Sequence, residues 1–411
     1  MAQVHPFHAV LPFPPVAAAV AAPPYDVISA AEAADQAKDN PLSFFHVSRS
    51  EIDLPPGTDP HADAVYEKAR ENYRRIRREA PLLRETEPVF YVYSLVMQGR
   101  RQTGIVAAAS VDDYDADIIK KHEKTRKDKE DDRTRHILTL RSQTGPVFLT
   151  CKPAAALAAL QERIMGGTPL LDITPADGVR HTVWRVAAAA DIQTVRDLFG
   201  RMPALYIADG HHRAASASRV RETLARQNPA HTGAEEYNRF LCVIFPADQL
   251  QILPYNRLVA DLNGLAPAEF LKRCETHFRI TPAATPAPAT PGTIHLFLGG
   301  RWLAMTCTAA TAGLSPMDRL DVSLLQNLVL APVLGIDDPR TSQRLEFVGG
   351  IRGTGVLEEK VRAGEAAAAF SMYPTTVEQL MDIADAGGIM PPKSTWFEPK
   401  LRDALLIHDL D

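Results

Sequence analysis

The sequence predicts a mixed α/β protein of the α+β kind, and three observations carry this prediction. Short apolar runs typical of buried strands alternate along the chain with amphipathic helical patterns. Hydrophobic residues make up 45% of the chain and charged residues 23%, which is an ordinary globular composition. At 411 residues the chain exceeds a typical single domain, so we expect two or three lobes.

The first part of the chain, residues 1–112, is expected to form an N-terminal α/β extension. Apolar residues recur at helical spacing through residues 65–76, with arginines between them. Residues 89–97 form an apolar run rich in β-branched and aromatic side chains, and residues 103–110 are expected to pair back onto it as a hairpin. Residues 44–47 are also expected to form a short strand.

Residues 113–280 are expected to form the core. Acidic and basic residues are mixed through residues 120–136, and the default prediction for such a stretch is an exposed, salt-bridged helix. A zinc site is disfavoured there, because Arg126 stands where H-E-x-x-H requires its second histidine. Further strands and helices are predicted at residues 147–150, 154–165, 179–186, 192–199, 240–245, 251–253 and 270–278.

We expect this core to be organised around residues 204–226, ALYIADGHHRAASASRVRETLAR. An apolar run, the turn pair Asp209-Gly210 and a helical pattern follow one another, so the predicted order is strand, tight turn and helix. The first N–H groups of a helix lack partners within it, and the helix dipole favours a phosphate there. Gly210 lets the backbone come close, Arg213 can grip two phosphate oxygens, and Asp209 can hold a metal ion. The alternative is that Asp209 merely caps the helix, with both histidines at a surface turn.

A C-terminal α/β lobe is expected at residues 293–411, after a linker at residues 281–292 (TPAATPAPATPG). The linker is rich in proline and lacks large apolar residues, so it cannot pack a core. The glycine-rich residues 349–355 do not follow G-x-G-x-x-G, and a turn is predicted there. The lobe is expected to contain a hairpin of residues 294–298 and 302–305, a helix at 321–334, and a helix that begins with the capping box Thr375-x-x-Glu378.

Near the C-terminus, residues 387–395 (GGIMPPKST) are similar to a P-loop without completing one. Pro392 stands where the second glycine belongs, and proline has no N–H group to offer a phosphate. Lys393, Ser394 and Thr395 could still contact a phosphate from an extended loop.

The net charge and the spacing of the cysteines limit the kinds of partner and the cellular compartment that we expect. A net charge of −5 argues against nucleic acid as the main partner. Residues 10–22 are apolar but are broken by prolines and lack a basic leading region, so we expect no secretory signal, and no apolar run is long enough to span a bilayer. A cytoplasmic protein with reduced thiols is expected, because the cysteines are widely separated: Cys151, Cys242, Cys274 and Cys307.

Three segments taken together resemble a known family. They are H-E at residues 122–123, D-G-H-H-R at residues 209–213 and P-K-S-T at residues 392–395. In this order they resemble the free L-serine kinases and the related bacterial domain-of-unknown-function 1015 (DUF1015) family. PPYDVI, H-E-K-T with Asp132-Arg133, and PPKSTWFEPK are similar to the long bacterial branch of that family. The resemblance implies a ParB/sulfiredoxin-like nucleotide-binding core.

The resemblance also implies a function. The free serine kinases convert L-serine into O-phospho-L-serine with a nucleotide, ATP or ADP, and Mg²⁺. By this likeness Glu123 is the general base, Asp209 and His211 are catalytic, and Asp209 is also the metal ligand. Phosphate binding is assigned to Gly210, His212, Arg213, Lys393, Ser394 and Thr395, and substrate binding to His122 and Thr125.

Elementary chemistry supports these roles independently. Phosphoryl transfer asks mainly for positioning and charge neutralisation, and a carboxylate suffices as the base for a hydroxyl. The second hypothesis is a nucleotide-binding switch or regulator that kept the phosphate site and lost transfer. The presence of Glu123 distinguishes the two hypotheses only weakly. A protein that only binds nucleotide needs no general base, whereas a kinase does. The acceptor, the phosphate donor and the oligomeric state stay open.

Overall fold

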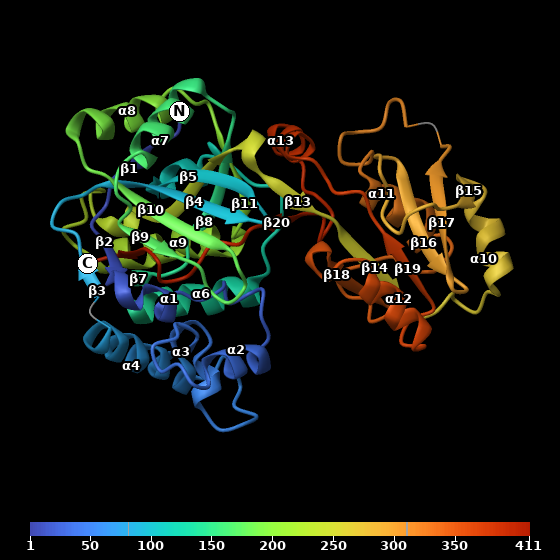
Figure 1. Ribbon diagram of the computed structural model, residues 1–411, viewed down its shortest axis with the longest axis horizontal. Helices are drawn as coiled ribbons and strands as arrows, with labels where there is room; N and C mark the ends of the chain where they lie inside the picture. The colour runs from blue at the N-terminus through green and yellow to red at the C-terminus, as the bar shows by residue number, and fades with distance from the viewer. Residues whose placement is uncertain (81, 310) are drawn as a thin grey trace. The chain divides into compact units, whose positions relative to one another are not determined.

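The computed structural model describes residues 1–80, 82–309 and 311–411 and divides into two compact units (Figure 1). The larger unit comprises Met1–Leu250 and Pro399–Asp411, and the smaller unit comprises Gln251–Glu398. Both units combine helices with sheets, which confirms the predicted mixed α/β class. Among the described residues, no helix has the length and apolar character that a membrane span requires.

The larger unit contains most of the elements. Its strands are β1 (Val4–His5), β2 (Ala9–Pro12), β3 (Leu82–Arg84), β4 (Phe90–Met97), β5 (Arg100–Ser110), β6 (Ile119–Lys120), β7 (Ser142–Gln143), β8 (Val147–Cys151), β9 (Leu171–Ile173), β10 (Arg180–Val186), β11 (Leu205–Asp209), β12 (Arg239–Pro246) and β21 (Ile407–Asp409). Its helices are η1 (Pro14–Val16), α1 (Ala17–Val20), α2 (Ala30–Ala37), α3 (Phe45–Ser48), η2 (Ser50–Asp53), α4 (Asp63–Glu79), α5 (Val111–Asp115), α6 (Lys127–Leu140), α7 (Ala155–Met165), α8 (Ala189–Phe199), α9 (His211–Gln227), η3 (Glu236–Asn238) and η4 (Ala247–Gln249).

One large sheet organises this unit. Its strand order is β6-β11-β8-β12-β5-β4-β10-β9, with β1 paired to β5. The predicted hairpin is present, because β4 and β5 pair antiparallel from Tyr91 opposite Val106 to Met97 opposite Arg100. The short strand β11 lies between β8, which is antiparallel to it, and β6, which is parallel to it. The chain therefore leaves the sheet at the end of β11, near one edge.

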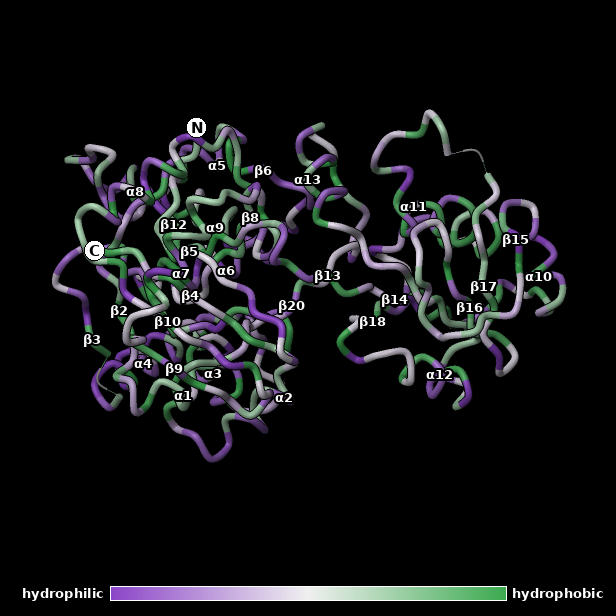
Figure 2. Tube along the Cα trace, turned by 45° about the horizontal axis from the view of Figure 1, so that its top comes forward, coloured by the Kyte–Doolittle hydropathy of each residue, from purple (hydrophilic) through white to green (hydrophobic). Residues whose placement is uncertain are grey.

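Two apolar clusters hold the larger unit together. Alternate residues of β4, β5, β8, β11 and β12 pack on one face of the sheet against α7, α8 and α9. A second cluster contains residues of the four helices α1, α2, α3 and α4 and of the strands β2 and β21. Figure 1 shows α2, α3 and α4 grouped together in blue. Figure 2 shows hydrophobic residues along the central strands and hydrophilic residues on the peripheral loops. The segment Pro399–Asp411 belongs to the larger unit because Ile407 packs in the second cluster.

The smaller unit is built around a six-stranded sheet with the order β15-β17-β16-β19-β14-β18. A separate pair, β13 with β20, lies where the chain enters and leaves this unit. Its strands are β13 (Gln251–Leu253), β14 (Tyr255–Val259), β15 (Phe278–Pro282), β16 (Thr293–Leu298), β17 (Arg301–Cys307), β18 (Leu345–Gly349), β19 (Ala368–Ser371) and β20 (Trp396–Glu398). Its helices are α10 (Pro267–Cys274), α11 (Asp321–Leu325), η5 (Gln326–Leu330), η6 (Gly350–Arg352), α12 (Gly355–Arg362) and α13 (Val377–Asp385).

Several sequence-based expectations differ from the structure. Residues 44–47 were expected as a strand, but α3 is a helical turn whose aromatic and β-branched side chains are buried against α4. The capping box of α13 is formed by Thr376 and Gln379, one residue later than predicted. The charged stretch becomes helical only from Lys127, and it is not fully exposed, because Asp132 and His136 are buried.

The expected domain boundaries also differ from the compact units. Residues 1–112 and 113–250 share one large sheet and belong to the same unit. The proline-rich residues 281–292 run from the end of β15 to the start of β16, and both of these strands pair with β17. Composition identifies this stretch as unable to pack a core but cannot distinguish a linker between units from a loop inside one.

We expect Gly104→Ala to destabilise the larger unit. Gly104 lies in β5, and an added Cβ would meet Cδ1 of Phe245 at 2.8 Å and the carbonyl oxygen of Ile244 at 2.9 Å. Overpacking of this kind costs about 1–3 kcal/mol, which denaturant unfolding would measure. Gly355→Ala is the matched control, because its Cβ would meet nothing within 4 Å. Equal stabilities of the two variants would contradict the prediction.

Candidate active site

The turn from β11 into α9 has the geometry that the sequence predicts. Gly210 adopts the left-handed conformation, with φ 92° and ψ 29°, and α9 begins at the next residue. As the N-cap residue it has no side chain with which to cap the helix. The carboxylate Oδ1 of Asp209 accepts the N–H of Gly210 at 2.8 Å. Asp209 therefore stabilises the turn itself, and the alternative in which it caps α9 is not what forms.

The two histidines at the start of α9 attach the H-E loop to the helix. Nε2 of His211 accepts the backbone N–H of His122 at 3.4 Å, and Nε2 of His212 accepts the backbone N–H of Arg126 at 3.1 Å. The rings of His122 and His211 also meet edge to face, with centroids 4.4 Å apart. Two of the three predicted motifs thus lie side by side within the larger unit, although about 90 residues separate them.

These contacts place Glu123 beside His211. Since Nε2 of His211 accepts an N–H, the neutral ring carries its proton on Nδ1. This Nδ1 lies 3.8 Å from Oε2 of Glu123. The Glu123 side chain is 41% exposed while that of His211 is 4% exposed. A half-exposed carboxylate thus lies beside a buried ring.

Burial keeps the site histidines neutral at neutral pH. It lowers the pKa of His122 to about 4, although the negative charge of Asp209 acts in the opposite direction. Burial and the neighbouring His122 ring hold the pKa of His211 well below its usual range. Nδ1 of His122 is also buried and has no hydrogen-bond partner among the described residues. Neither ring adds a positive charge to the site.

Asp209 is paired with a lysine from the C-terminal segment. Its Oδ2 accepts from Nζ of Lys400 at 2.9 Å. Burial opposes ionisation of Asp209, but Lys400 and Arg213 outweigh it and hold the pKa of its carboxyl group well below the usual range. The sequence analysis did not assign Lys400, although it belongs to the PPKSTWFEPK segment that resembles the long bacterial branch.

Arg213 points into the protein rather than toward the H-E loop. Its side chain is 9% exposed, and Nη1 donates to the carbonyl oxygen of Pro146 at 2.6 Å. Nη2 lies 3.3 Å from Oδ2 of Asp26, in the PPYDVI segment. Both terminal nitrogens are thus engaged inside the protein and are not presented as a fork to a phosphate. The PPYDVI segment, which carries part of the family resemblance, thus supplies the acidic partner of this arginine.

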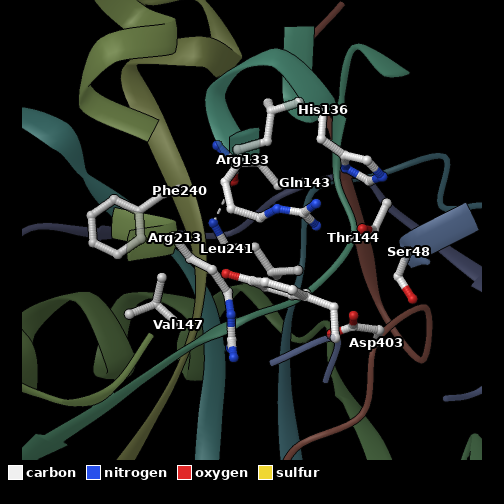
Figure 3. A pocket seen from close by; sticks show the side chains of 13 residues that line it. Ser48, Arg133, His136, Gln143, Thr144, Val147, Arg213, Phe240, Leu241 and Asp403 are labelled. Carbon is white, nitrogen blue, oxygen red and sulfur yellow. Dashed lines mark hydrogen bonds between the residues drawn. The ribbon is translucent and has the colours of Figure 1, made fainter. Parts of the chain in front are cut away.

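A cavity of about 40 Å³ lies behind the turn (Figure 3). Several segments of the larger unit contribute to its wall, and Figure 3 shows Phe240 and Val147 on one side of the view and Ser48 and Asp403 on the other. The lining residues are Tyr25, Ser48, Arg133, His136, Ile137, Gln143, Thr144, Gly145, Val147, Arg213, Phe240, Leu241 and Asp403. Apart from Arg213, sequence reasoning assigned none of these residues to a site.

The remaining predicted residues have internal partners. Thr125 Oγ1 donates to the carboxylate of Glu130 in α6. In the smaller unit, the buried Ser394 hydroxyl donates to the carbonyl oxygen of Pro391 at 2.6 Å, so it is not free for a phosphate. Lys393 is exposed, with Nζ 5.5 Å from the ring centroid of Tyr255, and Thr395 is half-buried. The meeting of P-K-S-T, which belongs to the smaller unit, with the other two motifs stays a prediction.

The lowered pKa of His122 predicts a loss of stability in acid. The unfolded chain binds a proton near the ordinary value of 6.5, whereas the folded protein resists protonation down to about 4. The contribution of this residue to stability is therefore complete above about pH 6.5 and is lost as the pH falls toward 4. Between pH 7.5 and pH 5, we expect the parent protein to lose about 2 kcal/mol more of its free energy of unfolding than His122→Gln loses. Denaturant unfolding of both proteins at the two pH values measures this difference. Identical pH dependences of the parent and the variant would contradict this.

Some solved structures are distantly similar to this protein. A free serine kinase in complex with AMP matches with a TM-score of 0.36 and 15% identity, over 74% of this chain and 92% of that chain. A conserved hypothetical protein from Pyrococcus furiosus matches with a TM-score of 0.35 and 14% identity, over 73% and 93%. SbnI with a C-terminal truncation, from Staphylococcus aureus, matches with a TM-score of 0.40 and 11% identity, over 72% and 85%. Similarities this distant do not indicate an activity.

The amino-acid sequence matches one family model over most of its length. No curated protein matches the chain significantly. The family described as "Protein of unknown function (DUF1015)" matches residues 4–323, which include the H-E and D-G-H-H-R motifs. The family expected from the motifs is thereby confirmed, and this chain belongs to the DUF1015 family.

Proposed function

We propose that this protein is a nucleotide-dependent phosphotransferase that phosphorylates the hydroxyl group of a free amino acid, with L-serine as the first candidate. The observation that carries the proposal is the attachment of the H-E loop to the start of α9. It brings the Glu123 carboxylate within 3.8 Å of His211 Nδ1, beside a helix end without a capping side chain. The motif resemblance to the free serine kinases supports the reaction class.

In this proposal Glu123 is the general base. Its exposed carboxylate accepts the proton of the acceptor hydroxyl as that oxygen forms a bond to the terminal phosphorus of the nucleotide. The bond from this phosphorus to the bridging oxygen breaks, and the electron pair leaves with the nucleotide. His211 lies beside Glu123, with Nδ1 3.8 Å from Oε2, and stays neutral throughout.

The start of α9 is the proposed phosphate site. The N–H groups of the first helical turn have no partners within the helix, and the N-terminal dipole favours negative charge. Lys400 adds a cation nearby through its ion pair with Asp209. Gly210 lets a phosphate approach the backbone because it has no Cβ. We assign the phosphate contact to this backbone.

Mg²⁺ fits the proposal as an ion carried by the nucleotide. No group of three or more histidine, cysteine or acidic side chains is placed to hold a metal ion in the described part of the chain. In phosphotransfer sites Mg²⁺ usually takes one or two carboxylates, and phosphates and water complete its coordination. Asp209 offers one carboxylate, for which Lys400 competes at Oδ2. When bound, the ion would neutralise charge on the phosphates.

A specific observation favours the second candidate, a nucleotide-binding regulator without transfer. Asp209 and Arg213 already have oppositely charged protein partners, Lys400 and Asp26 respectively. Paired side chains of this kind can exchange their protein partners for a bound phosphate, and this exchange would let the protein respond to the nucleotide. A regulator of this kind would bind nucleotide and leave every amino acid unphosphorylated.

The decisive experiment incubates the protein with labelled ATP or ADP, Mg²⁺ and a panel of free amino acids. We expect a phosphorylated amino acid and a drop in kcat of about a hundredfold to ten-thousandfold for Glu123→Gln. Nucleotide affinity should change little in this variant, because a base acts only when the hydroxyl attacks. Glu222→Gln, which alters an exposed glutamate on α9 paired with Arg226, is the matched control and should keep full turnover.

The outcomes separate the candidates. Nucleotide binding without any phosphorylated product would support the regulator. Normal turnover of Glu123→Gln would remove this residue from the mechanism. Loss of both nucleotide binding and turnover would make Glu123 a metal ligand or a folding residue.

A second prediction tests the phosphate site at the turn. In Gly210→Ala the added Cβ would lie 3.3 Å from Arg213 Nη1, at a backbone φ of 92° that costs other residues roughly 1–2 kcal/mol. We expect the turn to rearrange and nucleotide affinity, measured by calorimetry, to fall about tenfold or more. Gly178→Ala is the control, because Gly178 also has a positive φ but nothing lies within 4 Å of its Cβ position. Unchanged nucleotide affinity in Gly210→Ala would place the phosphate elsewhere.

A further inference from the structure

The carboxylate of Asp209 lies where β11 meets α9, and both of its oxygens have protein partners. Oδ1 accepts the N–H of Gly210 at 2.8 Å, and Oδ2 accepts from Nζ of Lys400 at 2.9 Å. The first contact belongs to the turn itself, whereas the second comes from the C-terminal segment, 191 residues away. The oxygen that the turn does not use is therefore held by Lys400.

Both members of this ion pair reach the protein surface. The side chain of Asp209 is 30% exposed and that of Lys400 is 17% exposed. Arg213 differs from them, because its buried side chain faces Asp26 inside the protein. A ligand at the start of α9 can therefore contact Asp209 and Lys400 together, since Oδ2 and Nζ lie 2.9 Å apart.

The ion pair makes Asp209 a poor site for a free divalent cation. Burial opposes ionisation of Asp209, but Lys400 and Arg213 hold the pKa of its carboxyl group well below the usual range, so the carboxylate is ionised at neutral pH. Mg²⁺ gives up its water reluctantly and is usually bound by one or two carboxylates together with substrate phosphates. A free ion would have to displace Lys400 and would gain no phosphate in return.

The backbone just after Lys400 is held in the larger unit, whereas its side chain can change partner. Arg402 is buried and forms an ion pair with Asp177. The N–H of Asp403 donates to the carbonyl oxygen of Ala22 at 2.9 Å, and the N–H of Ala22 donates back to the carbonyl oxygen of Asp403 at 3.3 Å. The ammonium group of a lysine sits on a flexible four-carbon chain, so it can turn from one anion to another nearby.

We propose that Lys400 exchanges Asp209 for a phosphate oxygen when a nucleotide binds at the start of α9 together with its divalent cation. Until then, Lys400 blocks Asp209 against the free cation. The exchange leaves no charge unpaired, because Lys400 passes from a carboxylate to a phosphate and Asp209 passes from an ammonium group to the cation. A charge left without a partner in a partly buried site would be costly.

This inference rests on the proposed function for its ligand, but it adds an order of binding that the proposed reaction does not require. The divalent cation enters with the nucleotide rather than before it. The two proposals can fail separately. A protein that binds nucleotide and phosphorylates no amino acid would remove the proposed function and leave the exchange at Lys400 standing. The failure of the exchange appears instead in the affinity for the cation.

The test uses electron paramagnetic resonance to measure how tightly Mn²⁺, a paramagnetic substitute for Mg²⁺, binds the full chain. Without nucleotide, we expect Lys400→Gln to bind Mn²⁺ at least about tenfold more tightly than the parent, because no charge-assisted hydrogen bond from Lys400 has to be broken. With saturating ADP, the two proteins should bind Mn²⁺ equally, because a phosphate replaces Asp209 as the partner of Lys400. Equal affinities without ADP, including no binding by either protein, would overturn the proposal. Tighter binding by Lys400→Gln in both conditions would also overturn it, since Lys400 would then never leave Asp209.

Two further variants control for charge and for the release of a carboxylate. Lys400→Arg keeps a cation opposite Asp209 and should bind Mn²⁺ as weakly as the parent, with the fold of each variant checked by circular dichroism. Lys360→Gln removes a lysine whose Nζ lies 2.6 Å from Oε1 of Glu346 in the smaller unit, and it should leave the Mn²⁺ affinity unchanged. A gain in Lys360→Gln as large as that in Lys400→Gln would mean that any released carboxylate binds Mn²⁺, and it would overturn the assignment to Asp209.

Discussion

The left-handed turn at Gly210 is the constraint on which the candidate site depends. With φ at 92°, the chain passes from β11 into α9 through a single residue. This abrupt change of direction turns His211 and His212 toward the H-E loop and Arg213 into the protein. A residue with a side chain could hold this conformation only under strain. One backbone conformation thus determines where the H-E loop meets the helix and where the proposed phosphate site lies.

Paired charges connect this turn to both ends of the larger unit. Arg213 faces Asp26 from the N-terminal part, and Asp209 is paired with Lys400 from the C-terminal segment. The partners lie 187 and 191 residues away in the sequence. The same contacts that shape the site therefore also tie the chain termini to the core.

Much of the fold and part of the site follow from local pattern. The hairpin of β4 and β5, the strand-turn-helix around Gly210 and the helix α4 are all where periodicity and turn chemistry predict them. The prediction was wrong at residues 44–47, where strand-forming residues make the helical turn α3 because they pack against α4. It was also wrong about the surface of α6, because residues such as Asp132 are buried by contacts with Tyr66 that no local window contains.

The sequence by itself determined the family, the α/β class and the motifs that carry chemistry, because these depend on residue identity and short-range spacing. Only the tertiary structure decided which charges neutralise one another. Lys400 carried no separate signal in the sequence, and Arg213 looked like a phosphate ligand until its partners Asp26 and Pro146 were placed. Long-range pairing of charges depends on chain topology, and no local spacing encodes it.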